Sequence, residues 1–212
     1  MNVLITGTYS GLGRAAAERF LRAGHTVTGI DLVPASILHD RYRHVLFDLR
    51  VDAPLPPLGA VHILVNSAGS REENGALELD LMALMRVTET YGVQKDIRSI
   101  CNVAAADAYA GSPLYAAAKG GVLSYTKNVA LRVAAYGATC NTLSPGGVTT
   151  NLRAVASDPV LRSRIQDSTL LRKWASPEEI AEWIFFLTVV NRSMTAQDVV
   201  VDNGEMFCRP FR

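Results

Sequence analysis

The feature that most constrains this chain is a glycine-rich turn between a predicted strand and a predicted helix near the N-terminus. Asn2–Thr6 is a short apolar run with β-branched residues, which predicts a buried strand. The turn Gly7–Gly13 follows, and the strong helix formers of Arg14–Arg22 predict a helix that ends at Gly24. Strand, turn and helix in this order form half of a nucleotide-binding βαβ unit, because the N–H groups and positive dipole at the helix start suit a pyrophosphate.

The next predicted strand places an acid where a nucleotide ribose is expected. His25–Ile30 predicts a strand, and Asp31 stands at its end, about 20 residues beyond the glycines. A carboxylate there accepts a ribose 2′-hydroxyl and repels a 2′-phosphate, which favours NAD over NADP. Two simpler interpretations stay open: the glycines, spaced Gly-x3-Gly-x-Gly, form only a turn, and Asp31 is a loop acid exposed to water.

Length and composition limit the possible classes. A chain of 212 residues suffices for one large core, and its formal net charge of +1 gives no sign of a nucleic-acid or acidic-membrane partner. No basic segment precedes an apolar stretch at the N-terminus, and the apolar run Ile184–Val190 is too short to span a bilayer. Cys101, Cys140 and Cys208 are scattered without metal-ligand spacing. We therefore expect a cytoplasmic protein without a metal site.

Strands and helices alternate along the chain, which predicts one doubly wound parallel α/β sheet, Rossmann-like, of about seven strands with helices on both faces. The further predicted strands are Arg43–Phe47, Val61–Val65, Ile97–Val103, Ala138–Leu143 and Gln197–Val201. The further predicted helices are Leu77–Tyr91, Ala116–Ala135, Asp158–Asp167 and Pro177–Val190. Three prolines between Pro54 and Pro57 exclude a normal helix after the third strand, so we expect a compact loop there.

A tyrosine and a lysine near the start of one predicted helix are candidates for proton transfer. Tyr115 and Lys119 are four residues apart and therefore share a helix face. A lysine ammonium beside a phenol stabilises the phenolate, so the tyrosine could exchange a proton with a substrate hydroxyl while a hydride moves to or from nicotinamide. The alternative is an ordinary amphipathic helix start.

Taken together, these motifs resemble the short-chain dehydrogenase/reductase family over essentially the whole chain. The matching segments, in order, are Thr6-Gly7-x3-Gly11-x-Gly13, Asp31, Asp48, Asn66-x-Ala68-Gly69, Tyr115-x3-Lys119, Pro145-Gly146 with Thr150, and Val201-Asp202-x-Gly204.

The resemblance implies a role for many residues. The implied cofactor-binding residues are Gly7, Tyr9, Ser10, Gly11, Leu12, Gly13, Asp31, Asp48, Leu49, Asn66, Ala68, Gly69, Tyr115, Lys119, Pro145, Gly146, Val148 and Thr150. Asp48 and Leu49 would flank the adenine, Lys119 would bind the nicotinamide ribose, and Val148 and Thr150 would hold the carboxamide. The chain would form a single NAD-binding domain over residues 1–212, in which residues 151–175 form a lid over the substrate.

Two departures from the family pattern concern the chemistry. The family's fifth strand ends in serines, one of which hydrogen-bonds the substrate oxygen, but Ala105 stands at the aligned position. Ser112 or Tyr109, in the loop that follows, are possible substitute donors. Where the family has an asparagine that holds a relay water, Asp80 aligns, and it serves either as a substitute or as a helix-face charge.

The resemblance implies an NAD-dependent oxidoreductase acting on a secondary alcohol or its ketone in a small-molecule substrate. Tyr115 would be the acid/base and Lys119 its modulator. Two alternatives remain: a non-redox enzyme of the family, such as a dehydratase or isomerase, and a nucleotide-binding scaffold without turnover. The helices Leu77–Tyr91 and Ala116–Ala135 resemble those that pair across subunits in the family, which predicts a homodimer or homotetramer.

Overall fold

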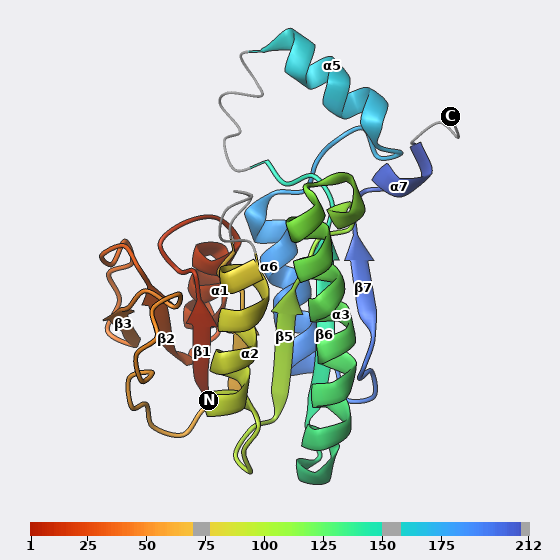
Figure 1. The fold of residues 1–212 in the computed structure, drawn as a ribbon. Coiled ribbons are helices and arrows are strands. Elements are labelled where there is room, and N and C mark those ends of the chain that lie inside the picture. Colours follow the sequence, from red (N-terminus) through yellow and green to blue (C-terminus); the bar gives the residue numbers. More distant parts are fainter. Residues whose placement is uncertain (70–76, 150–157, 209–212) are drawn as a thin grey trace.

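Seven parallel strands form one sheet in the order β3-β2-β1-β4-β5-β6-β7 (Figure 1). The computed structural model describes residues 1–69, 77–149 and 158–208. The strands are β1 (Asn2–Thr6), β2 (Thr26–Asp31), β3 (Tyr42–Leu46), β4 (Ile63–Asn66), β5 (Ser99–Val103), β6 (Thr139–Pro145) and β7 (Asp198–Val201). The prediction of a doubly wound parallel sheet is confirmed.

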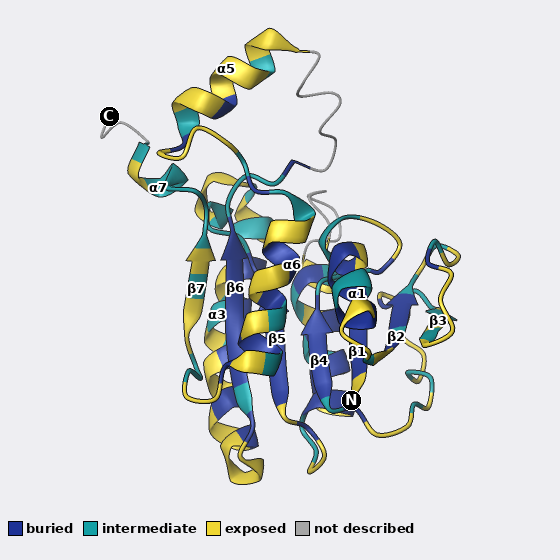
Figure 2. Ribbon diagram, turned by 180° about the vertical axis from the view of Figure 1, so that it is seen from behind, coloured by how far each residue is buried: buried dark blue, intermediate teal, exposed yellow. Residues whose placement is uncertain are grey.

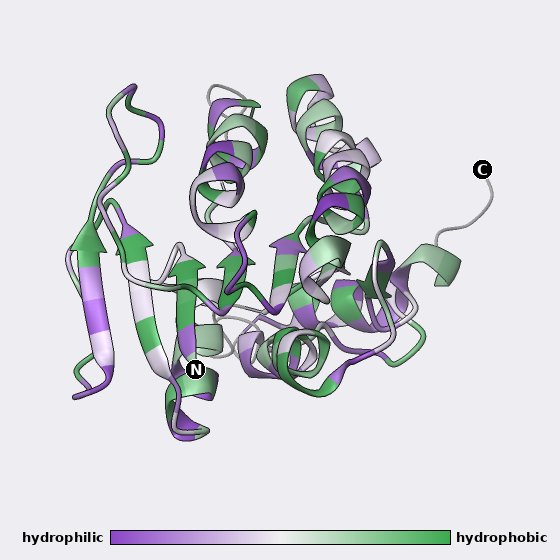
Figure 3. Ribbon diagram, turned by 90° about the horizontal axis from the view of Figure 1, so that it is seen from below, coloured by the Kyte–Doolittle hydropathy of each residue, from purple (hydrophilic) through white to green (hydrophobic). Residues whose placement is uncertain are grey.

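Helices cover both faces of the sheet, as the views from behind and from below show (Figures 2 and 3). One layer contains α1 (Gly11–Arg22) and α6 (Pro177–Phe185), which pack against each other. The other layer contains η1 (Leu77–Ala83), α2 (Leu84–Val87), η2 (Thr88–Gly92) and α3 (Pro113–Val133). The remaining elements are η3 (Ala108–Ala110), η4 (Ala134–Tyr136), α5 (Pro159–Ser168), η5 (Phe186–Val190) and α7 (Glu205–Cys208).

The core consists of two apolar layers, one on each face of the sheet. Every residue of β4 and β5 is buried, as expected for central parallel strands covered on both sides (Figure 2). The strand β7, at one edge of the sheet, is partly exposed along its length. The buried centre of the sheet therefore fixes where the carboxyl ends of the strands lie.

The crossover from β3 to β4 is a loop without a helix, as the prolines predict. Two side chains of the neighbouring helical segment donate hydrogen bonds to three carbonyl groups of this loop. Arg86 donates to the carbonyl oxygens of Leu49, at 2.9 Å, and Val51, at 2.7 Å. The Tyr91 hydroxyl donates to the Pro56 carbonyl at 2.5 Å. These side-chain hydrogen bonds thus hold the loop against the helical layer that contains α2 and η2.

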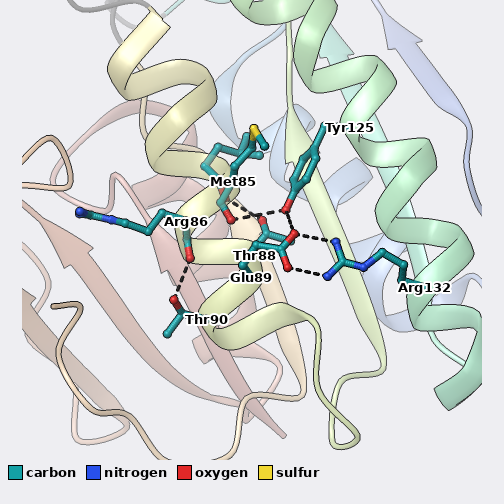
Figure 4. A network of polar contacts seen from close by, with 8 residues as sticks. Met85, Arg86, Thr88, Glu89, Thr90, Tyr125 and Arg132 are labelled. Carbon is teal, nitrogen blue, oxygen red and sulfur yellow. Dashed lines mark hydrogen bonds and ion pairs between the residues drawn. The ribbon is translucent and has the colours of Figure 1, made fainter. Parts of the chain in front are cut away.

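A polar cluster joins η2 to α3 on the surface of the second layer (Figure 4). Glu89 accepts hydrogen bonds from the Arg132 guanidinium and, at 2.7 Å, from the Tyr125 hydroxyl. The Arg132 guanidinium lowers the pKa of Glu89, and burial raises the pKa of Tyr125. This ion pair links α3 to η2.

The helix predicted over Leu77–Tyr91 is present but irregular, because wide π-helical turns at both ends flank the single α-helical turn α2. The short elements η3 and α7 were not predicted. Neither has a buried residue, so their sequences carry no apolar periodicity from which to infer them. In the described part of the chain, we find no helix with the length and apolarity needed to cross a membrane.

Candidate functional site

A cleft of about 620 Å³ lies at the carboxyl ends of the strands, where ligands bind in open parallel sheets. Most of the predicted site residues line it. They are Gly7, Tyr9, Ser10, Leu12, Gly13, Asp31, Asp48, Leu49, Ala68, Gly69, Asp80, Ala105, Tyr115, Lys119, Pro145, Gly146 and Val148. Thr150 lies outside the described residues. The fold therefore brings together groups that are far apart in the sequence.

The glycine turn allows a ligand to approach its backbone closely. A Cβ at Gly13 would overlap the Gly7 carbonyl, and Gly7 has a φ of +76°, so neither position accepts another residue without strain. The helix α1 begins after Ser10, whose side chain makes no capping hydrogen bond in the described structure, and its first turn contains no acid. The first N–H groups of α1 therefore remain suited to bind an anion.

Asp31 sits at the end of β2, beside this turn. Its two carboxylate oxygens accept hydrogen bonds from the backbone N–H groups of Tyr9, at 2.8 Å, and Val33, at 3.0 Å. These bonds orient the carboxylate, and each oxygen retains a further lone pair for a ligand hydroxyl.

Asp48 and Leu49 form the cleft wall next to Asp31. Asp48 is ion-paired with Arg50 at 2.8 Å, and this guanidinium holds the pKa of the Asp48 carboxyl below its usual range. Leu49 is buried against the second core layer and presents an apolar surface to the cleft. The pair combines a polar edge with an apolar wall, which suits a heteroaromatic ring.

Asn66 does not line the cleft, although the resemblance includes it among the cofactor residues. Its amide donates to the Thr88 hydroxyl at 2.9 Å and to the Asn102 side chain at 2.8 Å, both deep in the interior. Asn102 in turn donates to the hydroxyl of Thr126 on α3. Asn66 thus holds β4, β5 and the helical layer together beneath the cleft floor.

Tyr115 and Lys119 both line the cleft from the first turns of α3. Ser112 is the N-cap of this helix, and its hydroxyl accepts a hydrogen bond from the Tyr115 N–H at 3.3 Å. The Lys119 side chain is 8% exposed, and its Nζ donates to the Val103 carbonyl oxygen at 3.3 Å. That Nζ lies 5.7 Å from the centre of the Tyr115 ring. The ammonium is therefore close enough to influence the phenol electrostatically.

Asp80 forms a buried ion pair with this lysine. The Asp80 Oδ1 lies 2.7 Å from the Lys119 Nζ, and the Asp80 side chain is 1% exposed. A Cβ on Gly69 would overlap the Asp80 carboxylate, so the glycine leaves the space that the carboxylate occupies. Of the two interpretations of Asp80, a substitute at the asparagine position or a helix-face charge, its inward position favours the former.

Ala105, after β5, stands at the position of the serine in the family pattern and has no hydroxyl. Ala104 and Ala105 line the cleft, together with Asp107, which the sequence analysis did not single out. Ser112 serves as a helix cap, and Tyr109 is 61% exposed, with its hydroxyl 3.6 Å from the sulfur of Met206. Neither Ser112 nor Tyr109 lines the cleft.

The loop Pro145–Val148 forms another part of the cleft wall. Gly147 donates its N–H to the Glu205 carboxylate at 2.8 Å, and Gly146 donates to the Val201 carbonyl at 3.0 Å. The C-terminal helix α7 thus fixes this wall through Glu205. No sequence signal pointed to Glu205, because it is one acid in a short segment without a pattern.

The predicted lid is described only from residue 158 onward. Its helix α5 projects beyond the carboxyl ends of the strands (Figure 1). Asp158 caps this helix, and Ile165 is its one buried residue. Among the described residues, no group of three or more His, Cys, Asp and Glu side chains is placed to hold a metal ion.

The sheet order and the cleft at its carboxyl edge define a doubly wound α/β protein of the Rossmann type. Residues 81–205 match the family described as "Enoyl-(Acyl carrier protein) reductase". The chain is 32% identical over 186 residues to the short chain dehydrogenase adrF of Penicillium rubens, covering 74% of this chain and 72% of the relative. It is 27% identical over 235 residues to the 3-oxoacyl-[acyl-carrier-protein] reductase FabG of Vibrio harveyi, covering 96% of each. The chain belongs to the short-chain dehydrogenase/reductase family, a family of oxidoreductases.

Solved structures agree with this fold. The ligand-free aldohexose dehydrogenase of Thermoplasma acidophilum has a TM-score of 0.81 and 24% identity, covering 100% of this chain and 96% of that one. Two other neighbours are 4-hydroxyisoleucine dehydrogenase complexed with NADH, with a TM-score of 0.82 and 21% identity, and ElxO with NADP bound, with a TM-score of 0.83 and 20% identity. Each of these two comparisons covers 97% of this chain and 98% of the other. At these identities the likeness concerns the fold.

Proposed function

We propose that this chain is an NAD(H)-dependent oxidoreductase that interconverts a secondary alcohol and its ketone in a small-molecule substrate. The observation that carries the proposal is that the glycine turn, Asp31, Tyr115 and Lys119 line one cleft. A dinucleotide-sized cleft with an anion site at one end and an acid/base group at the other matches the needs of hydride and proton transfer.

The residues present fit a nicotinamide dinucleotide. The Gly7–Gly13 turn leaves no Cβ in the way of a pyrophosphate, and the start of α1 offers N–H groups to it. Asp31 would accept the adenosine ribose hydroxyls, and its charge opposes a 2′-phosphate. The next two residues of the cleft wall, Leu32 and Val33, are apolar and offer no positive charge to a 2′-phosphate, which supports NAD rather than NADP.

When bound, the cofactor supplies or accepts the hydride. The protein would transfer the proton: the Tyr115 hydroxyl would donate it to the substrate oxygen in reduction and accept it in oxidation. Lys119 would hold the nicotinamide ribose and set the electrostatic environment of the phenol. Val148 and, outside the described residues, Thr150 would orient the carboxamide. Residues 151–175 would cover the substrate as part of a single domain, which we place in the cytoplasm.

The test uses the full chain with NAD at alkaline pH and a panel of secondary alcohols. We expect reduction of NAD with at least one alcohol, and a loss of about 10²-fold or more in Tyr115→Phe, since proton transfer is removed. Tyr136→Phe, at the far end of the same helical segment, is the matched control and should keep its rate. Turnover that survives in Tyr115→Phe would refute the assignment of the acid/base.

A second candidate function is favoured by the alanines that follow β5. Without a hydroxyl at Ala105, and with Ser112 serving as a helix cap, the cleft could bind the dinucleotide in a scaffold or in a non-redox enzyme such as a dehydratase or isomerase. Calorimetry of NADH binding distinguishes these functions. Binding without NAD turnover on any alcohol would favour the second candidate, and absence of binding would refute both.

A further inference from the structure

A chain of side-chain hydrogen bonds connects the glycine turn to the cleft wall that follows Asp31. The hydroxyl of Thr8, in the glycine turn, lies 2.8 Å from the Tyr42 hydroxyl. The Tyr42 hydroxyl lies 2.9 Å from Nδ1 of His44, and Nε2 of His44 lies 2.9 Å from the Val33 carbonyl oxygen. Thr8, Tyr42 and His44 do not line the described cleft, whereas Val33 does. The chain therefore acts on the cleft only through the residues that it holds.

Two neighbouring strands make room for this chain. Tyr42 and His44 are two residues apart on β3 and therefore share one face of the sheet. On β2, a Cβ at Gly29 would lie 2.3 Å from both the Thr8 and the Tyr42 hydroxyl oxygens, so the glycine leaves the space for their hydrogen bond. Thr8 is fully buried, and the Tyr42 hydroxyl is the hydrogen-bond partner of its side chain.

The direction of each hydrogen bond follows from the acceptor at the end of the chain. The Val33 carbonyl oxygen can only accept, so Nε2 of His44 carries a proton. In the neutral ring Nδ1 then accepts, the Tyr42 hydroxyl donates to it, and the Thr8 hydroxyl donates to Tyr42. Burial, the largest cause, raises the pKa of Tyr42, so this hydroxyl keeps its proton and remains a donor. Each link thus has one donor and one acceptor.

The same segments are joined a second time through Asp31. Its carboxylate accepts hydrogen bonds from the N–H groups of Tyr9, at 2.8 Å, and Val33, at 3.0 Å. The Ser36 hydroxyl donates to the Tyr9 carbonyl oxygen at 2.7 Å. Val33 is therefore held at its N–H by Asp31 and at its carbonyl by His44. The backbone that carries Asp31 cannot turn away from the glycine turn without breaking this closed set of hydrogen bonds.

We propose that Tyr42 and His44 are positioning residues that set the preference of the cleft for a free ribose 2′-hydroxyl over a 2′-phosphate. The inference rests on the proposed function and adds to it two residues outside the cleft. A fixed Asp31 carboxylate offers oriented acceptors to a ribose hydroxyl and keeps its charge where it opposes a 2′-phosphate. A carboxylate that is released loses both effects, so NADH binds less tightly and NADPH is excluded less strongly.

Calorimetry of NADH and NADPH binding tests the inference with Tyr42→Phe, which removes one hydroxyl and keeps the ring. We expect the ratio of the two dissociation constants, NADPH over NADH, to fall by about three- to tenfold, the range that corresponds to one hydrogen bond. Tyr91→Phe is the matched control, because it also removes a tyrosine hydroxyl that is bonded within the chain, to the Pro56 carbonyl and outside the cleft lining. The control should keep the wild-type ratio.

Two further variants test His44. His44→Leu removes both of its hydrogen bonds and should lower the ratio at least as far as Tyr42→Phe does. His44→Gln again offers an N–H to the Val33 carbonyl and should recover part of the ratio. A loss of stability alone weakens the binding of both dinucleotides by the same factor. An unchanged ratio in Tyr42→Phe or in His44→Leu, once circular dichroism has shown that the variant folds, would therefore overturn the inference, and if one of the two does not fold, the other decides.

A measurement without dinucleotide examines the hydrogen-bond chain itself. In protein with ¹⁵N-labelled histidine, NMR spectra in alkaline solution distinguish the two neutral tautomers, and the His44 signals are those missing in His44→Leu. We expect the Nε2–H tautomer in the wild type, and a shifted Nδ1 signal in Tyr42→Phe, because that variant removes the donor to Nδ1. The Nδ1–H tautomer would overturn the inference, since His44 could then not donate to Val33.

Failure of this inference can be told apart from failure of the proposed function. An unchanged ratio of dissociation constants would leave Tyr115 and Lys119 in their proposed roles. A wild type that binds NADPH as tightly as NADH would overturn the inference and the choice of NAD, while the test of Tyr115→Phe would still stand. Absence of NADH binding to the wild type would refute the inference and the proposed function together.

Discussion

Among single residues, Ala105 departs most from what the proposed function requires. It lines the cleft directly after β5, where a hydroxyl would donate to the substrate oxygen. The two predicted substitute donors do not line the described cleft, because Ser112 caps α3 and Tyr109 lies on the exterior against Met206. Under the proposed function, this position limits the rate through a missing hydrogen-bond donor.

Restoring that donor is a direct test. We expect Ala105→Ser to raise the turnover number by up to about 10²-fold, since one donor to a developing oxyanion is worth roughly that factor. Ala106→Ser, one position further along and outside the cleft lining, is the control and should leave the rate as it is. An equal rate in wild type and Ala105→Ser would mean that another group already supplies the hydrogen bond.

At the scale of elements, two ion pairs link α3 to the neighbouring helical segment. The Lys119–Asp80 pair is buried at the cleft, and the Arg132–Glu89 pair lies on the surface further along (Figure 4). The buried pair includes Lys119, a residue of the proposed site, whereas the exposed pair lies outside the cleft. The contribution of the exposed pair to the free energy of unfolding can therefore be measured without changing the cleft.

Its contribution should depend on pH in a defined sense. The pKa of Glu89 in the folded protein is lowered from its ordinary 4.5, chiefly by the Arg132 hydrogen bonds. The stabilisation is therefore present above the ordinary pKa and is lost as the pH falls through the lowered value. Because both side chains are more than 40% exposed, we expect Glu89→Gln to cost at most about 1 kcal/mol at pH 7. Urea unfolding of the wild type and of Glu89→Gln, at pH 7 and at a pH below the ordinary pKa of Glu89, measures the difference in their free energy of unfolding at each pH. A difference that is larger in acid than at pH 7 would contradict the expected sign.

For the whole molecule, we expect a second subunit to pack on the outer face of α3. This exposed face carries small residues between two exposed leucines and, nearer its C-terminal end, two polar side chains: Leu114, Ala117, Gly120, Ser124, Lys127, Asn128 and Leu131. Leu131 adds a large apolar side chain that is 79% exposed. Small residues allow a second helix to approach closely, which agrees with the expected homodimer or homotetramer.

A charged side chain on this face tests that expectation. A Cβ at Gly120 has open space around it within the chain, so Gly120→Arg should fold normally and still block the approach of another helix. We expect light scattering to show the wild type above the 22.9 kDa of one chain, and Gly120→Arg at that mass. Gly59→Arg, on an exposed loop with equal space, is the control. A wild type that is monomeric at every concentration would refute the prediction.

What the sequence determines here is whatever depends on residues close together in the chain. The apolar runs of β1, β4 and β5 predict buried strands, the glycines predict the anion-binding turn, the prolines exclude a crossover helix, and the spacing of Tyr115 and Lys119 puts them on one helix face. Each follows from local backbone sterics or from periodicity, which a sequence displays directly.

The tertiary structure decided the contacts between distant segments. From the sequence alone Asp80 has two interpretations, and only the packing of η1 against α3 brings its carboxylate to Lys119. In the same way, the fold places Asp107 in the cleft, turns Ser112 into a cap, directs Asn66 inward and bonds Glu205 to the Pro145–Val148 wall. The physical reason is that such pairings depend on how whole elements stack and register in three dimensions, and no short-range pattern in the sequence records that geometry.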